Sequence, residues 1–309
     1  MKILIIDEMH PSIHSLLEKE GHLVDYRPEI TRKEIEAVIG NYEGMIIRSK
    51  TPMDKALLEK AVGLKFIGRA GAGLDKIDLE YLEKKGIKLF TAAEGNRDAV
   101  GEHAIGMLLG LFNHLSQADV QVRKGIWQRE ENRGEELAGK TVGIIGYGNM
   151  GESFARKLRG FDVLVLAYDK YKKGFGNEYV EEVGFKRLVG EADILSLHVP
   201  LTDETRNFIT PEVLEQFAKP IYLINTARGE IISFDTINEG FERGILKGAV
   251  LDVLENEKFN SFTSAERLAF EKLASRENVM FSPHVAGWTF QSYEKINKVL
   301  VSKIVKAFK

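Results

Sequence analysis

The sequence predicts an α/β protein that contains two doubly wound parallel sheets with a cleft between them. Short apolar runs alternate with amphipathic stretches from the first residues onward, which is the pattern of consecutive βαβ units. The chain has 309 residues, more than a single hydrophobic core usually organises. A glycine-rich turn lies in the second half of the chain, so we expect the two sheets to carry different functions.

The first domain is expected to alternate strands with helices. Its expected strands are Lys2–Ile6, Gly44–Arg48, Lys65–Gly68 and Ile87–Phe90. Its expected helices are Pro11–Glu20, Asp54–Ala61 and Leu79–Lys85. One long helix is then expected over Ala99–Lys124, because apolar side chains recur there on one helical face. These side chains are Ala104, Met107, Leu108, Leu111 and Leu115.

A second βαβ series follows, and its apolar runs predict the strands of a second sheet. The expected strands are Thr141–Gly146, Val163–Ala167, Ile194–His198, Ile221–Asn225, Gly248–Leu251 and Val279–Ser282. The last amphipathic stretch, Ser292–Phe308, is expected to form a helix that packs back on the first domain.

Composition and charge exclude several classes of function. The chain has 43 Lys and Arg against 46 Asp and Glu, a net charge of −3. This balance lacks the excess of positive charge that binding to a nucleic-acid backbone needs. The sequence has no cysteine, which excludes disulfides and thiolate metal sites, and we expect no bound metal. The N-terminus has no signal-peptide pattern, and no apolar run is long enough to span a membrane. We therefore expect a cytoplasmic protein without membrane or nucleic-acid partners.

The glycine-rich turn has the spacing of a dinucleotide-binding loop. Gly146, Gly148 and Gly151 follow an apolar strand and open a helical stretch, and the next strand ends at Asp169. The first glycine permits the tight turn, the second lets the backbone approach a pyrophosphate, and the third lets helix and strand pack closely. A carboxylate at Asp169 can accept hydrogen bonds from both ribose hydroxyls and repels a 2′-phosphate. We therefore expect a Rossmann-type domain that binds NAD rather than NADP, although Lys170 and Lys172 nearby soften this exclusion.

Three polar side chains follow strands of the second domain, where wound sheets place their ligands. Arg228 follows one strand, Glu257 lies beyond Asp252 at the end of the next, and His284 follows the last. Oxidation of a hydroxy acid needs a base for the hydroxyl proton, a cation for the carboxylate and a bound nicotinamide. These residue types meet the first two needs.

A second histidine competes with His284 for the role in proton transfer. His198 also ends a strand, but Val199 and Pro200 follow it and suit the wall of an adenine pocket better than acid–base chemistry. His103 lies inside the expected long helix, where a structural role is more common. We therefore take His284 as the catalytic histidine.

These motifs together resemble the D-isomer-specific 2-hydroxyacid dehydrogenases, and the resemblance covers essentially the whole chain. It is carried by the stretches 68–75 (GRAGAGLD), 100–104 (VGEHA), 225–229 (NTARG), 252–257 (DVLENE) and 282–289 (SPHVAGWT). The resemblance implies that Arg228 binds the substrate carboxylate and carbonyl, that His284 exchanges the proton and that Glu257 pairs with His284. Glu255 is a nearby alternative, but the spacing from Asp252 favours Glu257.

The resemblance also implies the domain organisation and further contacts. Residues 1–94 and 287–309 would form the substrate-binding domain and 95–286 the NAD-binding domain, through which two copies would form a homodimer. Asp252 would orient the nicotinamide carboxamide. Further expected cofactor contacts are His198, Val199, Pro200, Asn149, Met150, Thr205, Thr226, Ala227 and Gly287.

Within the family, the sequence is most similar to members that oxidise 3-phosphoglycerate to 3-phosphohydroxypyruvate in serine biosynthesis. A phosphorylated substrate needs more cations than Arg228, and Arg48, Lys50 and Arg69 fall at or just after strands of the first domain. Other expected substrate contacts are the Ala70, Gly71 and Gly73 backbone, Asn96, and Arg129 from a partner subunit. The stretch 90–96 (FTAAEGN) departs from the Asn-Thr-Pro run usual in these enzymes.

Two other functions remain open at this point. The first is a glyoxylate or hydroxypyruvate reductase, or another 2-hydroxyacid dehydrogenase, with the same fold. The second is an NAD-sensing, corepressor-like scaffold, which the intact Arg228, Glu257 and His284 argue against. About twenty residues follow Thr289, too few for another domain with its own core, so we expect no C-terminal regulatory domain.

Overall fold

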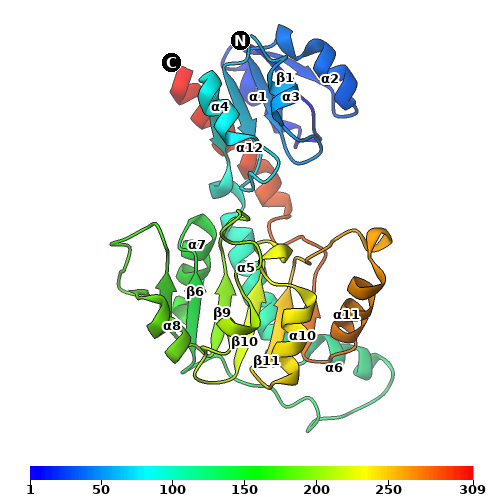
Figure 1. Ribbon diagram of the computed structural model, residues 1–309, viewed down its shortest axis with the longest axis vertical. Coiled ribbons are helices and arrows are strands. Elements are labelled where there is room, and N and C mark those ends of the chain that lie inside the picture. The colour runs from blue at the N-terminus through cyan, green and yellow to red at the C-terminus, as the bar shows by residue number, and fades with distance from the viewer. Residues whose placement is uncertain (309) are drawn as a thin grey trace. The chain divides into compact units, whose positions relative to one another are not determined.

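The computed structural model describes residues 1–308, which form two compact units (Figure 1). Unit 1 contains Met1–Arg97 and Trp288–Lys309, and unit 2 contains Asp98–Gly287. The chain therefore leaves unit 1, completes unit 2 and then returns to unit 1 for its last helix. Each unit is built on one parallel sheet with helices on both faces, which confirms the predicted fold class.

Unit 1 contains a five-stranded parallel sheet in the order β2-β1-β3-β4-β5. The strands are β1 (Lys2–Ile5), β2 (Leu23–Tyr26), β3 (Gly44–Ile47), β4 (Phe66–Arg69) and β5 (Lys88–Thr91). The helices are α1 (Ser12–Glu18), α2 (Arg32–Val38), α3 (Lys55–Leu58), α4 (Leu79–Lys85) and α12 (Phe290–Phe308). This is the flavodoxin-like strand order, which reverses direction between β1 and β3.

Alternating side chains of the unit 1 strands supply two hydrophobic clusters, one on each face of the sheet. Ile3 and Ile5 of β1 pack with buried residues of α1 and α12, whereas Leu4 and Ile6 pack with α2, α3 and α4. Helix α12 approaches the chain near β5 so closely that a Cβ on Gly95 would lie 2.6 Å from the Ile296 Cα. The last helix thus completes one face of the sheet that the first strand begins.

Unit 2 contains a seven-stranded parallel sheet in the order β12-β11-β10-β9-β6-β7-β8. The strands are β6 (Thr141–Ile145), β7 (Leu164–Tyr168), β8 (Glu181–Glu182), β9 (Ile194–Leu197), β10 (Ile221–Asn225), β11 (Leu246–Leu251) and β12 (Val279–Phe281). This is the Rossmann order with one added strand, and it reverses direction between β6 and β9. Ligands of such sheets bind beyond the carboxyl ends of the strands at that reversal.

Helices cover both faces of the unit 2 sheet. The helices of the unit are α5 (Ala93–Phe112), α6 (Leu115–Arg123), α7 (Asn149–Lys157), α8 (Phe185–Glu191), α9 (Pro211–Leu214), α10 (Phe234–Glu242) and α11 (Ser264–Ala274), and α6 alone among them buries no residue. Buried residues of α5 and α7 form a cluster on one face, and those of α8 to α11 form a cluster on the other. Short 3₁₀ turns occur at Ile39–Asn41, Leu158–Gly160, Gly229–Ile231 and Phe259–Ser261.

The prediction of a single long helix over Ala99–Lys124 is wrong, because the structure divides this stretch into α5 and α6. His114 lies between them with a left-handed φ of 50°, which an α-helix cannot contain. The carbonyl of Phe112 accepts a hydrogen bond from the Glu135 amide at 3.0 Å rather than continuing the helical ladder. The following loop therefore ends α5 by occupying its last carbonyl.

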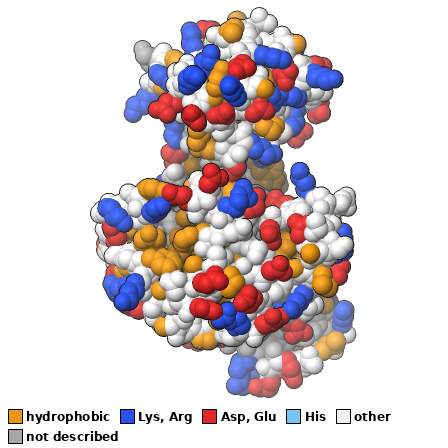
Figure 2. Space-filling view, in the orientation of Figure 1, with side chains coloured by type: hydrophobic (Ala, Val, Ile, Leu, Met, Phe, Trp, Pro, Cys, Tyr) orange, Lys and Arg blue, Asp and Glu red, His pale blue; other side chains and the backbone are white. Residues whose placement is uncertain are grey.

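The charged side chains are interspersed on the face of the molecule that Figure 2 shows, with Lys and Arg beside Asp and Glu over both units. Many of them form exposed ion pairs, such as Arg187 with Glu191. Within residues 1–308, no helix is long and apolar enough to cross a membrane.

Candidate functional site

The glycine turn after β6 has the local geometry that its sequence predicts. Gly146 has a φ of 93°, and a Cβ there would lie 2.6 Å from the carbonyl oxygen of His198. A Cβ on Gly151 would lie 2.1 Å from the Gly146 oxygen, so only glycine allows α7 to start this close to the strand. A Cβ on Gly148 would meet nothing within 4 Å. The N-terminal turn of α7, with Asn149 and Met150, therefore faces an open approach for an anion.

Asp169 lies just beyond β7 and closes the turn beside the glycine loop. Its Oδ2 accepts the Tyr147 amide at 2.8 Å, and its Oδ1 accepts the amides of Tyr171 at 2.9 Å and Lys172 at 2.8 Å. Burial opposes the charge, but hydrogen bonds from Lys172, Tyr147 and Tyr171 outweigh it and lower the pKa of Asp169. The carboxylate is therefore charged at neutral pH and also organises its own loop, a role that the sequence did not reveal.

The loop after β9 forms the opposite wall of the glycine turn. The His198 amide donates to the Ile145 carbonyl at 2.8 Å, and the Val199 side chain lies beside Gly146. His198 Nε2 lies 2.8 Å from Ser196 Oγ, and burial lowers the pKa of His198 to about 4. This imidazole is neutral at physiological pH. The Thr205 hydroxyl donates to the Pro200 carbonyl at 2.6 Å, so it stabilises this loop.

His284, Glu257 and Arg228 are brought together at the carboxyl edge of the same sheet. His284 Nδ1 lies 2.8 Å from Oε1 of Glu257, and both side chains are about half exposed. The hydrogen bond that the His284 ring donates to Glu257 raises the pKa of His284 above its ordinary 6.5. Burial opposes the rise, and so does the nearby charge of Arg228. The site thus contains a readily protonated imidazole beside a cation.

Asp252 supports the backbone that carries His284. The carboxylate is buried and accepts the amides of Val285 and Ala286 at 2.9 Å each and the Ser282 hydroxyl at 2.5 Å. Its own carbonyl accepts the His284 amide at 2.7 Å. Both carboxylate oxygens are therefore engaged within the chain. These contacts anchor the histidine loop, and the expected contact of Asp252 with a nicotinamide carboxamide stays a prediction.

Asn225, at the end of β10, supports the backbone that carries Arg228. Its buried side chain donates from Nδ2 to the Arg228 carbonyl at 2.9 Å and accepts the Ala227 amide at 3.1 Å. Arg228 itself donates to the Ala227 carbonyl at 2.6 Å. The buried amide therefore fixes the backbone from which the guanidinium extends.

A polar contact that the sequence did not indicate connects α5 to the histidine loop. His103 Nε2 lies 2.9 Å from Ser282 Oγ and 3.6 Å from the Asp252 carboxylate. These three residues are far apart in the sequence. The only sequence signal for this contact was that His103 lies in the stretch 100–104, which is part of the family resemblance.

The cations expected to bind a substrate phosphate lie in unit 1. The guanidinium carbon of Arg48 lies 4.2 Å from the Trp288 ring centroid and 5.5 Å from that of Tyr293, and Arg48 is partly buried. The Lys50 ammonium donates to the carbonyls of Pro28 and Ile30. Arg69 donates from Nε to the Gly73 carbonyl at 2.9 Å and from a terminal nitrogen to the Ala70 carbonyl at 2.6 Å. Arg69 thus holds its own turn, and Lys50 connects the segment after β3 to the one between β2 and α2.

The glycine-rich turn beside Arg69 already uses two of its amides within the chain. The Ala70 amide donates to the Ile47 carbonyl at 2.8 Å, and the Gly71 amide donates to the Arg69 carbonyl at 2.9 Å. The backbone amides of Ala72 and Gly73 are therefore the ones in this turn that can donate to a substrate carboxylate.

Two other expected substrate contacts lie elsewhere in the chain. Asn96 lies in the first turn of α5, and its Oδ1 is buried without a hydrogen-bond partner. Arg129 is exposed in the loop after α6.

Unit 2 has the features that a dinucleotide requires. Gly146, Gly148 and Gly151 form the cradle, and the Thr226 hydroxyl beyond β10 is buried without a hydrogen-bond partner. A buried hydroxyl without a hydrogen-bond partner is unusual, and a bound ligand at this strand end would supply the missing partner. The donor set therefore fits a nicotinamide dinucleotide, and Gly287 closes this unit just beyond the His284 loop.

Comparison with known proteins identifies the family. Residues 105–286 match the family "D-isomer specific 2-hydroxyacid dehydrogenase, NAD binding domain". The chain belongs to this family of NAD-dependent oxidoreductases, and this region is its NAD-binding domain. It is 32% identical over 305 residues to the hydroxypyruvate reductase of Thermotoga maritima, covering 99% of this chain and 97% of that protein.

The chain is also 31% identical over 314 residues to the D-3-phosphoglycerate dehydrogenase of Archaeoglobus fulgidus. That match covers all of this chain but spans only 58% of the length of that relative. Among solved structures, D-lactate dehydrogenase from Aquifex aeolicus in complex with NAD and lactic acid is similar with a TM-score of 0.81 and 29% identity. It covers 100% of this chain and 95% of the other.

Proposed function

We propose that this protein transfers a hydride between NAD and a D-2-hydroxy acid, with His284, Glu257 and Arg228 as its catalytic residues. The observation that carries the proposal is the 2.8 Å contact of His284 with Glu257 beside Arg228, on the same sheet edge as the glycine cradle. Bound NAD supplies the hydride acceptor, and NADH the donor.

The three residues divide the remaining chemistry. Arg228 presents a planar cation that can bind a substrate carboxylate in two places and so fix the orientation of the reacting carbon. In reduction, protonated His284 gives its Nε2 proton to the carbonyl oxygen, and in oxidation the neutral ring takes the hydroxyl proton. Glu257 holds the other ring nitrogen and stabilises the charged form.

We further propose 3-phosphoglycerate as the substrate in a step of serine biosynthesis. The relatives named D-3-phosphoglycerate dehydrogenase support this, and so does Arg48, a partly exposed cation just after β3 whose guanidinium forms no ion pair within residues 1–308. The domain assignment expected from the sequence, with the substrate domain in residues 1–94 and 287–309, is part of the same proposal.

Reduction of hydroxypyruvate or glyoxylate is the second candidate. The Thermotoga maritima hydroxypyruvate reductase matches over nearly its whole length, which favours it. The engagement of Lys50 and Arg69 with backbone carbonyls also favours a substrate without phosphate.

Steady-state kinetics with NADH decide between the two candidates. Catalytic efficiency is compared for phosphohydroxypyruvate, hydroxypyruvate and glyoxylate, in the wild type and in Arg48→Gln and Arg69→Gln. Loss of one charge-assisted contact, about 1.5–3 kcal/mol, should cost roughly ten- to a hundredfold with the phosphorylated substrate alone. Lys84→Gln in α4 is the matched control. A wild type that prefers hydroxypyruvate, with no change of ranking in either variant, contradicts the phosphoglycerate proposal.

We also propose a homodimer formed through unit 2. Large apolar side chains are exposed on α6 and the segment after it, which is unusual for a surface that meets only water. They are Leu115, Val120, Val122, Ile126 and Trp127. Sedimentation at micromolar concentration should give twice the mass of the chain, and Trp127→Glu should shift it toward monomer. The expected role of Arg129 in the partner's site depends on this dimer.

A further inference from the structure

Two loops at the carboxyl edge of the unit 2 sheet carry the proposed catalytic residues. Residues 226–233 connect β10 to α10 and contain Arg228, and residues 252–263 connect β11 to α11 and contain Glu257. The two loops touch backbone to backbone, because a Cβ on Gly229 would lie 1.9 Å from the carbonyl carbon and oxygen of Leu254. The position of one loop therefore depends on that of the other.

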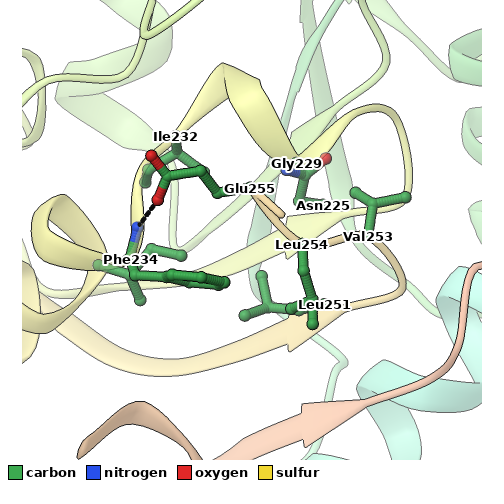
Figure 3. Close-up of a pocket in the computed structure, with 9 residues that line it drawn as sticks. Asn225, Gly229, Ile232, Phe234, Leu251, Val253, Leu254 and Glu255 are labelled. Atoms are coloured by element: carbon green, nitrogen blue, oxygen red, sulfur yellow. Dashed lines mark hydrogen bonds between the residues drawn. The ribbon is translucent and has the colours of Figure 1, made fainter. Parts of the chain in front are cut away.

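Glu255 adds a specific polar link between these loops. The amide of Phe234 donates to Oε2 of Glu255 at 2.8 Å (Figure 3). Phe234 is the first residue of α10, whose first amides have no partner within the helix. Ser233 caps a different amide of this turn, that of Thr236, at 3.1 Å. Glu255 is therefore not redundant with the helix cap.

The crevice around Glu255 is part of the loop packing rather than a ligand site. It is lined by Gly229, Ile232, Phe234, Leu254 and Glu255 among others, and it leaves no space for a water-sized molecule. The carboxyl group therefore meets protein on this side. Its contact with the Phe234 amide is a fixed part of the chain's own structure.

The surroundings of Glu255 are acidic. Burial raises the pKa of Glu255, the Phe234 amide opposes this, and the negative charges of Asp235, Glu266 and Glu230 raise the pKa further. These acids come from α10, α11 and the loop after β10. A neutral acceptor of the same shape would keep the hydrogen bond to Phe234 and avoid this repulsion, which makes glutamine the diagnostic substitution.

We propose that Glu255 is a positioning residue that fixes Glu257 against His284. Asp252 anchors the start of this loop beneath His284, and Glu255 attaches its middle to α10, two residues before Glu257. The fixed attachment sets where the Glu257 carboxylate meets His284 Nδ1. The proposal rests on the proposed function, in which His284 carries the proton, and Glu255 itself touches no substrate.

The test compares Glu255→Ala with Glu255→Gln in the full chain. The pKa of His284 is measured by NMR titration of its ring, and turnover is measured in parallel. In Glu255→Ala the pKa of His284 should fall toward that of Glu257→Gln, and kcat should fall by about ten- to a hundredfold, as expected for a small displacement of a catalytic group. NADH affinity should not change. Glu255→Gln, which keeps an acceptor for Phe234, should retain most of the turnover and the raised pKa.

Asp235→Asn is the matched control, because it removes a neighbouring charge and leaves the Phe234 hydrogen bond intact. If Glu255→Ala does not fold, Glu255→Asp takes its place, because the shorter side chain keeps the charge but does not reach the amide. An unchanged His284 titration in Glu255→Ala, or in Glu255→Asp where that variant replaces it, overturns the proposal. A Glu255→Gln protein that behaves like Glu255→Ala also overturns it. If no 2-hydroxy or 2-keto acid is turned over, the proposed function fails, while the titration of His284 still decides the role of Glu255.

Discussion

Two histidines follow strands of the same sheet, and their surroundings differ sharply. His198 lies just after β9, where burial lowers its pKa to about 4 and its Nε2 contacts the Ser196 hydroxyl. His284 lies after β12, half exposed and paired with Glu257, which raises its pKa. Position in a wound sheet therefore brings both imidazoles to the ligand edge, but only the carboxylate partner gives one of them a proton to donate near neutral pH.

The same comparison extends to the backbone. His284 has a left-handed φ of 55° and its loop is held by four hydrogen bonds to Asp252, one of them to the Asp252 carbonyl. Non-glycine residues rarely adopt left-handed backbone conformations, and they do so where surrounding contacts hold the backbone in place. The histidine proposed for catalysis thus sits on the more constrained backbone, whereas the His198 backbone packs against Gly146 as part of a pocket wall.

The largest expected effect comes from removing the ionisable imidazole. His284→Ala should reduce kcat by about two to four decades, because it removes the imidazole proposed to exchange the proton, while NADH binding stays near that of the wild type. His198→Asn should do the reverse, weakening NADH binding with a smaller change in kcat. Stopped-flow turnover and fluorescence titration with NADH measure the two quantities. Near-normal turnover in His284→Ala would transfer the role to His198.

An intermediate effect is expected when the partner of His284 is changed. Glu257→Gln removes the charge that raises the pKa of His284, so this pKa should fall. Reduction needs the protonated ring, so its basic limb should move to lower pH, and the acidic limb of oxidation should move in the same direction. The pairing of protonated His284 with Glu257 stabilises the folded state fully below pH 6.5, and this contribution is lost as pH rises through the raised pKa of His284 in the folded protein. Glu257→Gln should therefore lower Tm more at acidic than at basic pH. Profiles that coincide with those of the wild type contradict the pairing.

The smallest effect is expected at the cofactor ribose. Asp169→Ala should reduce the preference for NADH over NADPH by roughly tenfold, the order of one hydrogen bond to a charged group. It should also lower Tm, because three backbone amides lose their acceptor. Kd values for both cofactors measure the preference, with Asp203→Asn as an exposed acidic control. Equal binding of the two cofactors by the wild type would remove the role assigned to Asp169.

The order of strands and helices that position the site was largely predictable from the sequence. β10 and α4 begin and end where their patterns predict, because apolar runs bounded by polar turns set their limits. β2, β8 and several short helices were not predicted. β2 has an exposed Leu23 and no clear alternation, and β8 has two residues, so neither pattern resembles a buried strand. The break at His114 depends on a bond from Glu135, which a local pattern cannot reveal.

The site was predictable where its chemistry follows strand ends and less so where it depends on pairing. The glycine turn and the approach of Glu257 to His284 follow from the motifs. The sequence did not indicate that Asp252 uses both oxygens within the chain, or that Lys50 bonds to backbone carbonyls. Such contacts connect residues that are distant in the sequence, so no spacing rule records them.

Helix α12 has a consequence for the order in which the protein can fold during translation. The residues of unit 2 emerge from the ribosome before those of α12, so unit 2 can complete its sheet first even though unit 1 is begun first. Until then, the face of the unit 1 sheet that receives Ile296, Leu300 and Ile304 is covered only in part, by α1. We expect this apolar face to be the part of the nascent chain that needs protection by a chaperone, and a ribosome-bound chain halted before Phe290 should show it by protease sensitivity confined to unit 1.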